Sequence, residues 1–205
     1  MSVRDIFPVK IYETEFENFT EIQQDLKNKI KPLFETNTAS GNDYFDKDGQ
    51  PIFARTNPNI QNNPDLQILK DFINHHVKLY WQACSYTSKV DPYVMQMWAN
   101  DVPPGGFTPA HNHNPVPIAG VFYIDADEHQ GNLYLEDPLE IVKGKMPYDF
   151  LEKPYLYTET ITVKPGKLVL FPGWLRHHVR SNRATENRIV IGLNAGAFVE
   201  FKPEP

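Results

Sequence analysis

The chain has 205 residues and a formal net charge of -6, and 40% of its residues are hydrophobic and 22% charged. These values are ordinary for a globular protein, and the length suffices for one domain with a substantial hydrophobic core. The negative charge, together with the lack of any run of basic residues, argues against nucleic-acid and anionic-membrane partners.

The single cysteine, Cys84, leaves no intrachain disulfide, which fits a reducing compartment. The first residues lack the apolar core of a signal peptide. No stretch approaches the roughly 20 apolar residues that a membrane-spanning helix requires. We therefore expect a cytoplasmic protein without a membrane partner, in an oligomeric state that the sequence does not indicate.

Residues 1–90 carry two predicted helices. A short strand is expected at residues 9–12, and a helix then begins with Asn18 or Thr20 as its cap. Residues 35–63 are rich in Asn, Asp, Gly and Thr and predict a long loop that could close over a site as a lid. A second helix opens at Pro64-Asp65. The apolar faces are Ile22, Leu26 and Ile30 in the first helix and Leu66, Leu69, Phe72, Ile73, Val77 and Tyr80 in the second.

From Tyr93 onward the pattern changes to short strands. Helices first and antiparallel strands afterwards are typical of an α+β domain with a sandwich or barrel of strands. We predict one domain, residues 1–205, in which residues 1–90 form a helical and loop extension and residues 91–200 the strand core. The predicted strands are residues 93–99, 119–124, 132–136, 159–163, 168–171 and 188–193.

Two histidine-bearing segments are the main candidates for chemistry. His111 and His113 follow a Pro-Pro-Gly-Gly turn, and residues two apart in a strand project from the same face. A third imidazole from the distant pair His177-His178 would complete a metal site with open positions. Alternation along this second segment does not decide which histidine of the pair faces inward.

The order of these segments resembles the iron(II)- and 2-oxoglutarate-dependent dioxygenases, in particular the prolyl-hydroxylase-like branch. The resemblance covers roughly residues 93–198, and small bacterial and phage members share phrases such as Trp98-Ala99-Asn100. It implies a double-stranded β-helix core, a jelly roll like that of cupins, with the N-terminal helices packed on it. The matching phrases are His111-Asn112-His113, residues 120–124, 131–135 and 163–172, His177-His178-Val179 and residues 188–191.

By this resemblance, His111 is the first metal histidine and His177 the distal one. The family normally has a carboxylate two residues after the first histidine, and this chain has His113 there. One alternative is a three-histidine site of His111, His113 and His177. In the other, only His111 and His177 bind, and Asp137 or water supplies an oxygen. We favour the first, because His113 is expected on the correct strand face; Asp137 would then cap a turn with Pro138.

The resemblance also implies that Arg188 and Tyr123 hold the far carboxylate of 2-oxoglutarate. The planar guanidinium of arginine matches a carboxylate in a bidentate ion pair, and burying it without a partner is costly. Trp98 and Asn100, on the strand before the histidines, are expected to line the pocket.

The resulting hypothesis is an iron(II)- and 2-oxoglutarate-dependent oxygenase that hydroxylates an unactivated C–H bond of a small-molecule or peptidyl substrate. One alternative is a cupin-type metal-binding protein, or a dioxygenase that does not use 2-oxoglutarate. Cupins usually add a glutamate shortly after the second histidine, and residues 114–120 contain none. The other alternative is a non-catalytic β-sandwich binding module.

Overall fold

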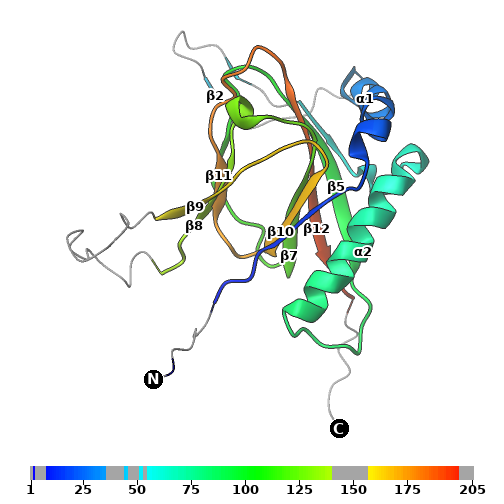
Figure 1. Cartoon of the computed structure of the whole chain (residues 1–205), viewed down its shortest axis with the longest axis vertical. Helices are drawn as coiled ribbons and strands as arrows, with labels where there is room; N and C mark the ends of the chain where they lie inside the picture. The colour runs from blue at the N-terminus through cyan, green and yellow to red at the C-terminus, as the bar shows by residue number, and fades with distance from the viewer. Residues whose placement is uncertain are drawn as a thin grey trace, which may run out of the picture.

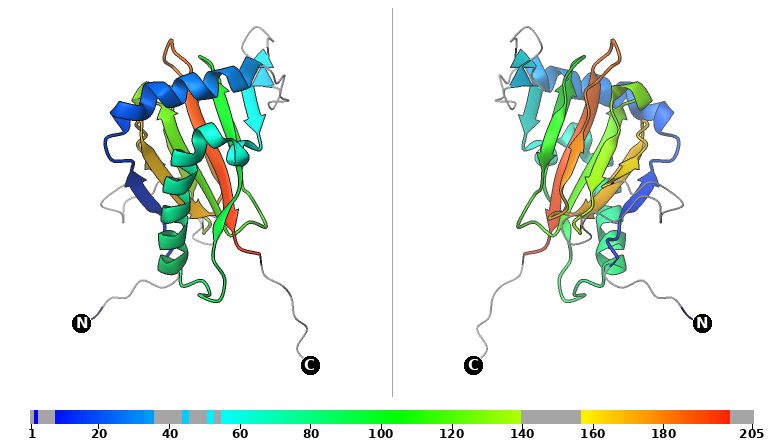
Figure 2. Two further views of the ribbon diagram at one scale, coloured as in Figure 1. Left: turned by 90° about the vertical axis from the view of Figure 1, so that its right-hand side faces the viewer. Right: turned by 90° about the vertical axis from the view of Figure 1, so that its left-hand side faces the viewer.

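In the computed structural model, two antiparallel sheets face each other and two helices cover the outer face of the larger sheet (Figures 1 and 2). The structure describes residues 2, 8–35, 44–45, 51–52, 55–139 and 157–198. The helices are α1 (Phe19–Glu35) and α2 (Gln67–Ala83), with 3-10 turns η1 (Ile60–Asn62), η2 (Pro64–Leu66) and η3 (Glu128–Gln130).

The larger sheet has six strands in the order β1 (Tyr12–Glu15), β10 (Lys167–Pro172), β7 (Ile118–Asp125), β12 (Arg188–Gly196), β5 (Tyr93–Val102) and β4 (Arg55–Pro58). The smaller sheet has the order β6 (Thr108–His111), β11 (His177–Val179), β8 (Leu133–Glu136) and β9 (Thr158–Ile161). A separate pair consists of β2 (Tyr44–Phe45) and β3 (Pro51–Ile52).

The eight strands from β5 to β12 divide between the two sheets as the chain proceeds. Strands β5, β7, β10 and β12 lie in the larger sheet, whereas β6, β8, β9 and β11 form the smaller one. All neighbouring pairs are antiparallel. This arrangement is a double-stranded β-helix, and the predicted α+β class is confirmed.

Alternation along the strands separates two hydrophobic cores. Phe122 packs in the core between the larger sheet and the helices, whereas its neighbour Tyr123 packs in the core between the sheets. Along β12, Ile189 and Ile191 face the helices. Because side chains alternate along a strand, residues 188, 190, 192 and 194 face the space between the sheets. This space holds the candidate site.

The two helices have the apolar faces that the sequence predicts. Leu26 and Ile30 of α1 and Leu69 and Ile73 of α2 are all at most 1% exposed, and they pack against the larger sheet. Burying a side chain of this size contributes roughly 1.5–3 kcal/mol. The first helix starts at Phe19, one residue before Thr20. None of the described helices combines the length and apolar character that a bilayer crossing requires.

Two predictions for the N-terminal part differ from the structure in the positions of strands. The first strand lies at Tyr12–Glu15, because it pairs with the edge of β10. Within the predicted loop 35–63, Arg55–Pro58 forms strand β4 against β5, and η1 follows. An edge strand is paired on one side only, so it tolerates polar residues and a proline. Such residues do not form the apolar alternation from which a strand is predicted. The remaining part of the predicted lid lies largely outside the described residues.

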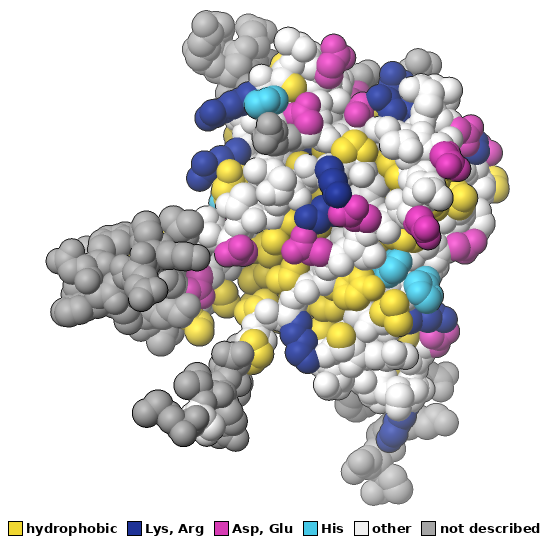
Figure 3. Space-filling view, in the orientation of Figure 1, with side chains coloured by type: hydrophobic (Ala, Val, Ile, Leu, Met, Phe, Trp, Pro, Cys, Tyr) yellow, Lys and Arg dark blue, Asp and Glu magenta, His cyan; other side chains and the backbone are white. Residues whose placement is uncertain are grey.

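Charged side chains of both signs are mixed on the molecular face shown in Figure 3. The Lys and Arg side chains on this face stand among Asp and Glu and do not merge into a continuous basic patch.

Candidate functional site

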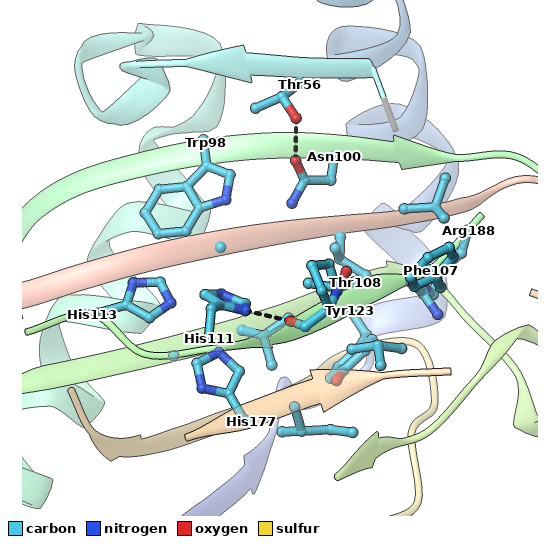
Figure 4. A pocket seen from close by; sticks show the side chains of 18 of the residues that line it. Thr56, Trp98, Asn100, Phe107, Thr108, His111, His113, Tyr123, His177 and Arg188 are labelled. Atoms are coloured by element: carbon cyan, nitrogen blue, oxygen red, sulfur yellow. Dashed lines mark hydrogen bonds between the residues drawn. The ribbon is translucent and has the colours of Figure 1, made fainter. Parts of the chain in front are cut away.

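Three imidazoles converge between the two sheets. His111 ends β6 and is paired with His177, the first residue of β11. His113 lies two residues beyond the end of β6. The ring centroids of His111 and His177 are 4.3 Å apart, and His113 lies 5.0 Å from His111 and 5.2 Å from His177. One ring nitrogen from each histidine lies within 4.8 Å of the others, and Figure 4 shows the rings gathered around one point.

Hydrogen bonds fix which nitrogen of each ring is available. The Nδ1 atoms of His111 and His177 lie 2.8 Å and 3.0 Å from backbone carbonyl oxygens of Pro109 and Leu175. The Nδ1 atom of His113 lies 2.8 Å from the side-chain oxygen of Asn194. A carbonyl or amide oxygen only accepts, so each Nδ1 carries hydrogen and donates it. Each Nε2 therefore keeps a free lone pair.

The environment of the cluster favours the neutral form of two of its imidazoles, those of His113 and His177. Burial lowers the pKa of His177 to about 3. Burial and the nearby His111 also lower the pKa of His113, whereas its hydrogen bond to Asn194 raises it. Metals bind neutral imidazole, and this nitrogen donor suits iron(II) and other divalent transition metals. The three Nε2 atoms, which the Nδ1 hydrogen bonds leave available, therefore fit such an ion.

The structure brings together the first of the two ligand sets that the sequence allows. Asp137 is outside the cluster, and its Oδ1 accepts a hydrogen bond from the backbone N–H of Leu139, as expected of a turn residue. His178 points away from the cluster, stacks on Tyr134 and lies 3.2 Å from Glu136. Strand β6 ends at His111, so His113 joins the cluster from the two residues that lie between this strand and the turn at 114–115.

A cavity of about 550 Å³ extends from the three histidines between the sheets. Its size is typical of sites for small molecules. Trp98 and Asn100 of β5 line it as the sequence predicts, and Tyr123 and Arg188 line the end away from His113 (Figure 4).

Arg188 is buried at this end, with 2% of its surface exposed. Its Nη1 donates to the carbonyl oxygens of Gln130 and Gly131, the latter at 3.3 Å. Gly131 has a φ of +92°, and a Cβ there would lie 2.9 Å from Nη1, so a glycine suits this approach. No described carboxylate pairs with the guanidinium. Burial lowers the pKa of Arg188, because desolvation disfavours its charged form.

Tyr123 offers a second donor at the same end. Its side chain is 2% exposed, and its hydroxyl makes no hydrogen bond with any described residue. Burial raises the pKa of Tyr123 more than the neighbouring Arg188 lowers it, so the phenol stays protonated. A buried hydroxyl without a partner is uncommon, because its desolvation is not compensated. A ligand with an acceptor group would satisfy both Tyr123 and Arg188.

The β5 wall also contains an oriented donor. Thr56 of β4 donates a hydrogen bond to Asn100 Oδ1 at 2.7 Å. The amide NH2 of Asn100 is therefore the group that can donate to a ligand in the cavity. Sequence reasoning missed Thr56 because its segment reads as a loop. Trp98 lies over Gly192 and stacks on His113 at 5.7 Å with an interplanar angle of 18°. A Cβ at position 192 would lie 2.3 Å from the indole.

Comparison with known families agrees with this geometry. Residues 96–194, just under half of the chain, match the family described as "Putative 2OG-Fe(II) oxygenase". In sequence over these residues, and in fold over most of its length, the chain is similar to iron(II)- and 2-oxoglutarate-dependent oxygenases. The match includes all three histidines, Tyr123 and Arg188. No curated protein sequence matches the chain.

Solved structures show how widely this oxygenase fold is shared. AviO1 from Streptomyces viridochromogenes Tue57 has a TM-score of 0.62 at 14% identity, covering 96% of this chain and 93% of that one. A Pseudomonas putida prolyl-4-hydroxylase has a TM-score of 0.63 at 11% identity, covering 93% and 94%. HygX from Streptomyces hygroscopicus, solved with nickel and 2-oxoglutarate, has a TM-score of 0.60 at 10% identity, covering 92% and 83%. At such identities the likeness shows the fold.

Proposed function

We propose that this protein uses iron(II) and 2-oxoglutarate to hydroxylate a C–H bond of a small-molecule or peptidyl substrate. The observation that carries the proposal is that a candidate metal site and a candidate anion site line the same cavity. A three-imidazole cluster lines it together with a buried arginine that has no described counter-ion and a buried hydroxyl that has no described partner. A cytoplasmic location is part of the proposal, because it would keep Cys84 and iron(II) reduced.

His111, His113 and His177 would hold the metal through their Nε2 atoms. When bound, iron(II) with 2-oxoglutarate supplies the O2-activating redox chemistry that no side chain provides. The cavity extends from the three imidazoles, so there is room beside them for further ligands of a metal. Their donated Nδ1 hydrogens keep each ring in the orientation that metal binding needs.

Arg188 and Tyr123 would hold the far carboxylate of 2-oxoglutarate. The carboxylate would offset the desolvation of the buried guanidinium charge and would accept a hydrogen bond from the phenol. Both side chains sit on neighbouring strands of the larger sheet, so the pocket is preformed. HygX is similar in fold and was solved with 2-oxoglutarate, which supports a cosubstrate of this kind.

Trp98 and Asn100 would contact the substrate. Trp98 presents an aromatic ring next to His113, and the amide NH2 of Asn100 is available to a carbonyl or hydroxyl oxygen. Hydroxylation is our choice among several outcomes, since similar folds include a prolyl-4-hydroxylase, a carbocyclase and an epimerase. The chain's own task is to place the substrate carbon beside the metal and to exclude water.

The test is to load the apo-protein with iron(II) under nitrogen and add 2-oxoglutarate. We expect a metal-to-ligand absorption band that saturates with one equivalent of 2-oxoglutarate. Admission of air should then yield succinate even without substrate, at a slow rate. Iron binding without the band would leave a cupin-type metal protein, and the absence of iron binding would leave a non-catalytic binding module.

A further inference from the structure

His113 differs from the other two histidines in what holds its ring. His111 and His177 each donate from Nδ1 to the backbone carbonyl two residues earlier, which their own strand segments supply. His113 lies beyond β6 and reaches across to Asn194 of β12, 81 residues away in sequence. We infer that Asn194, held by Gln96, is a positioning residue that makes a histidine usable at position 113. The inference rests on the proposed metal site.

Stacking fixes the plane of the His113 ring but not which of the two ring edges faces Asn194. Trp98 stacks on the ring at an angle of 18°, and His177 stacks on it at 16°. A half-turn about the bond from Cβ to the ring keeps both stacking contacts while it moves Nε2 away from the cluster. The bond from Nδ1 to Asn194 Oδ1, at 2.8 Å, distinguishes the two orientations. It also places the hydrogen on Nδ1, which frees Nε2 for the metal.

Gln96 determines which end of the Asn194 amide faces His113. The two residues are paired across β12 and β5, and Asn194 Nδ2 donates to Gln96 Oε1 at 3.2 Å. If the Asn194 amide turned over, its NH2 would face the Nδ1–H of His113, and its oxygen would face the oxygen of Gln96. With the Gln96 amide in its present orientation, both contacts would then be lost. Gln96 therefore keeps the Asn194 oxygen directed at His113.

This requirement is specific to histidine at position 113. A carboxylate has no tautomer to select, and either of its oxygens can bind a metal. An aspartate there would need no acceptor at position 194. Asn194 and Gln96 thus form a support that matches the replacement of the usual carboxylate by His113.

The test measures cobalt(II) binding to the apo-protein by competition with a chelating dye, together with the visible spectrum of the bound ion. Asn194→Leu should weaken cobalt binding roughly 10–100-fold, as is typical when the partner of a metal-bound histidine is removed. Gln96→Leu leaves Asn194 in place but free to turn over, so its loss should be roughly 2–10-fold. The matched control is Asn28→Leu on the exposed face of α1, where Asn28 accepts a hydrogen bond from Gln24, and this variant should bind like the parent.

A double-mutant cycle with His113→Asp separates positioning from general damage. If Asn194 acts through the histidine, Asn194→Leu should cost less than about threefold in the His113→Asp background. An equal loss in both backgrounds would assign Asn194 a structural role and overturn the inference. So would unchanged cobalt affinity in Asn194→Leu when the parent binds. A parent that binds no cobalt would instead overturn the proposed metal site itself.

A measurement on the parent covers the case in which Asn194→Leu does not fold. In the zinc-loaded parent, nitrogen NMR of the ring should show His113 metal-bound at Nε2 and protonated at Nδ1, with a slowly exchanging Nδ1 hydrogen. Metal binding through Nδ1, or an Nδ1 hydrogen that exchanges with water at once, would show that Asn194 does not hold the ring, and the inference would fail.

Discussion

Tyr123 and Arg188 stand on adjacent strands, β7 and β12, and both line the same cavity. Each carries a hydrogen-bond donor that a ligand with an acceptor group could pair with. The tyrosine hydroxyl has no described hydrogen-bond partner, and the guanidinium has two carbonyl contacts but no described carboxylate. Each feature alone destabilises the empty protein. The two features lie beside three imidazoles, which is why we propose this pair as the site of an anionic ligand.

Replacing Arg188 with Leu should weaken 2-oxoglutarate binding strongly. The carboxylate of the cosubstrate would be left unpaired in a desolvated pocket, a loss of about 3–5 kcal/mol, or roughly a hundredfold or more. Arg188→Lys should be intermediate, since lysine keeps the charge but lacks the planar fork. Calorimetric titration of the metal-loaded proteins under nitrogen gives the three affinities.

Metal affinity is the control for this series, because Arg188 is not part of the histidine cluster. It should be the same in all three proteins. Equal 2-oxoglutarate affinity in the parent and in Arg188→Leu would place the carboxylate site elsewhere.

Replacing Tyr123 with Phe should change stability and ligand binding in opposite directions. The apo-protein loses a buried hydroxyl without a described partner, so its free energy of unfolding should rise by about 1 kcal/mol. Binding of 2-oxoglutarate loses a hydrogen bond to a charged group, so its affinity should fall roughly 10–100-fold. Urea unfolding of the apo-protein and calorimetry of the loaded one measure the two effects. A destabilised apo-protein would mean that the hydroxyl has a partner in the folded chain.

His111→Ala and His177→Ala should each abolish stoichiometric iron binding while leaving the fold intact. Each variant removes one of three converging imidazoles, and the remaining two still donate to their own acceptors. Iron content after anaerobic loading and gel filtration, with far-UV circular dichroism as the fold control, decides the matter. Full iron content in both variants would move the metal site elsewhere. His178→Ala is the matched control, because His178 faces Glu136 and Tyr134.

Gly192→Ala should disturb the wall next to the metal site. The added methyl group would lie 2.3 Å from the Trp98 indole, so the ring must move or the sheet must spread. Overpacking of this kind typically costs about 1–3 kcal/mol of stability. Thermal unfolding should show the loss, and the double variant Gly192→Ala/Trp98→Leu should recover most of it. Equal losses in the single and double variants would show that the clash is not with Trp98.

Much of the fold follows from periodicity in the sequence. We could predict the two helices and the apolar strands because each buries one face at a regular spacing of apolar residues. Those faces are buried in the structure. Strand β4 was not predictable, because it is polar and exists through pairing with β5. Strand β11 is only three residues long, too short to show a period.

The candidate site was predictable only in part. Its histidines, Tyr123 and Arg188 stand in phrases that resemble a known family. The contacts of Thr56 with Asn100 and of Asn194 with His113 join residues that are 44 and 81 positions apart, which no local pattern encodes. One signal for Asn194 does exist. It shares the inward face of β12 with Arg188, and a polar residue there is unusual in a largely apolar strand.

The role of His113 leads to a final prediction about the ligand set. If His113 is the third ligand, His113→Ala should weaken iron binding by more than the roughly 10–100-fold typical of losing an outer partner of a metal-bound histidine. His113→Asp should retain the metal, because aspartate brings a ligand oxygen to the same place. Iron affinity by anaerobic chelator competition tests both variants. Asp137→Asn serves as the control, since Asp137 lies outside the cluster and bonds the backbone of Leu139. Unchanged iron affinity in His113→Ala would remove His113 from the ligand set, and loss in Asp137→Asn would replace it with Asp137.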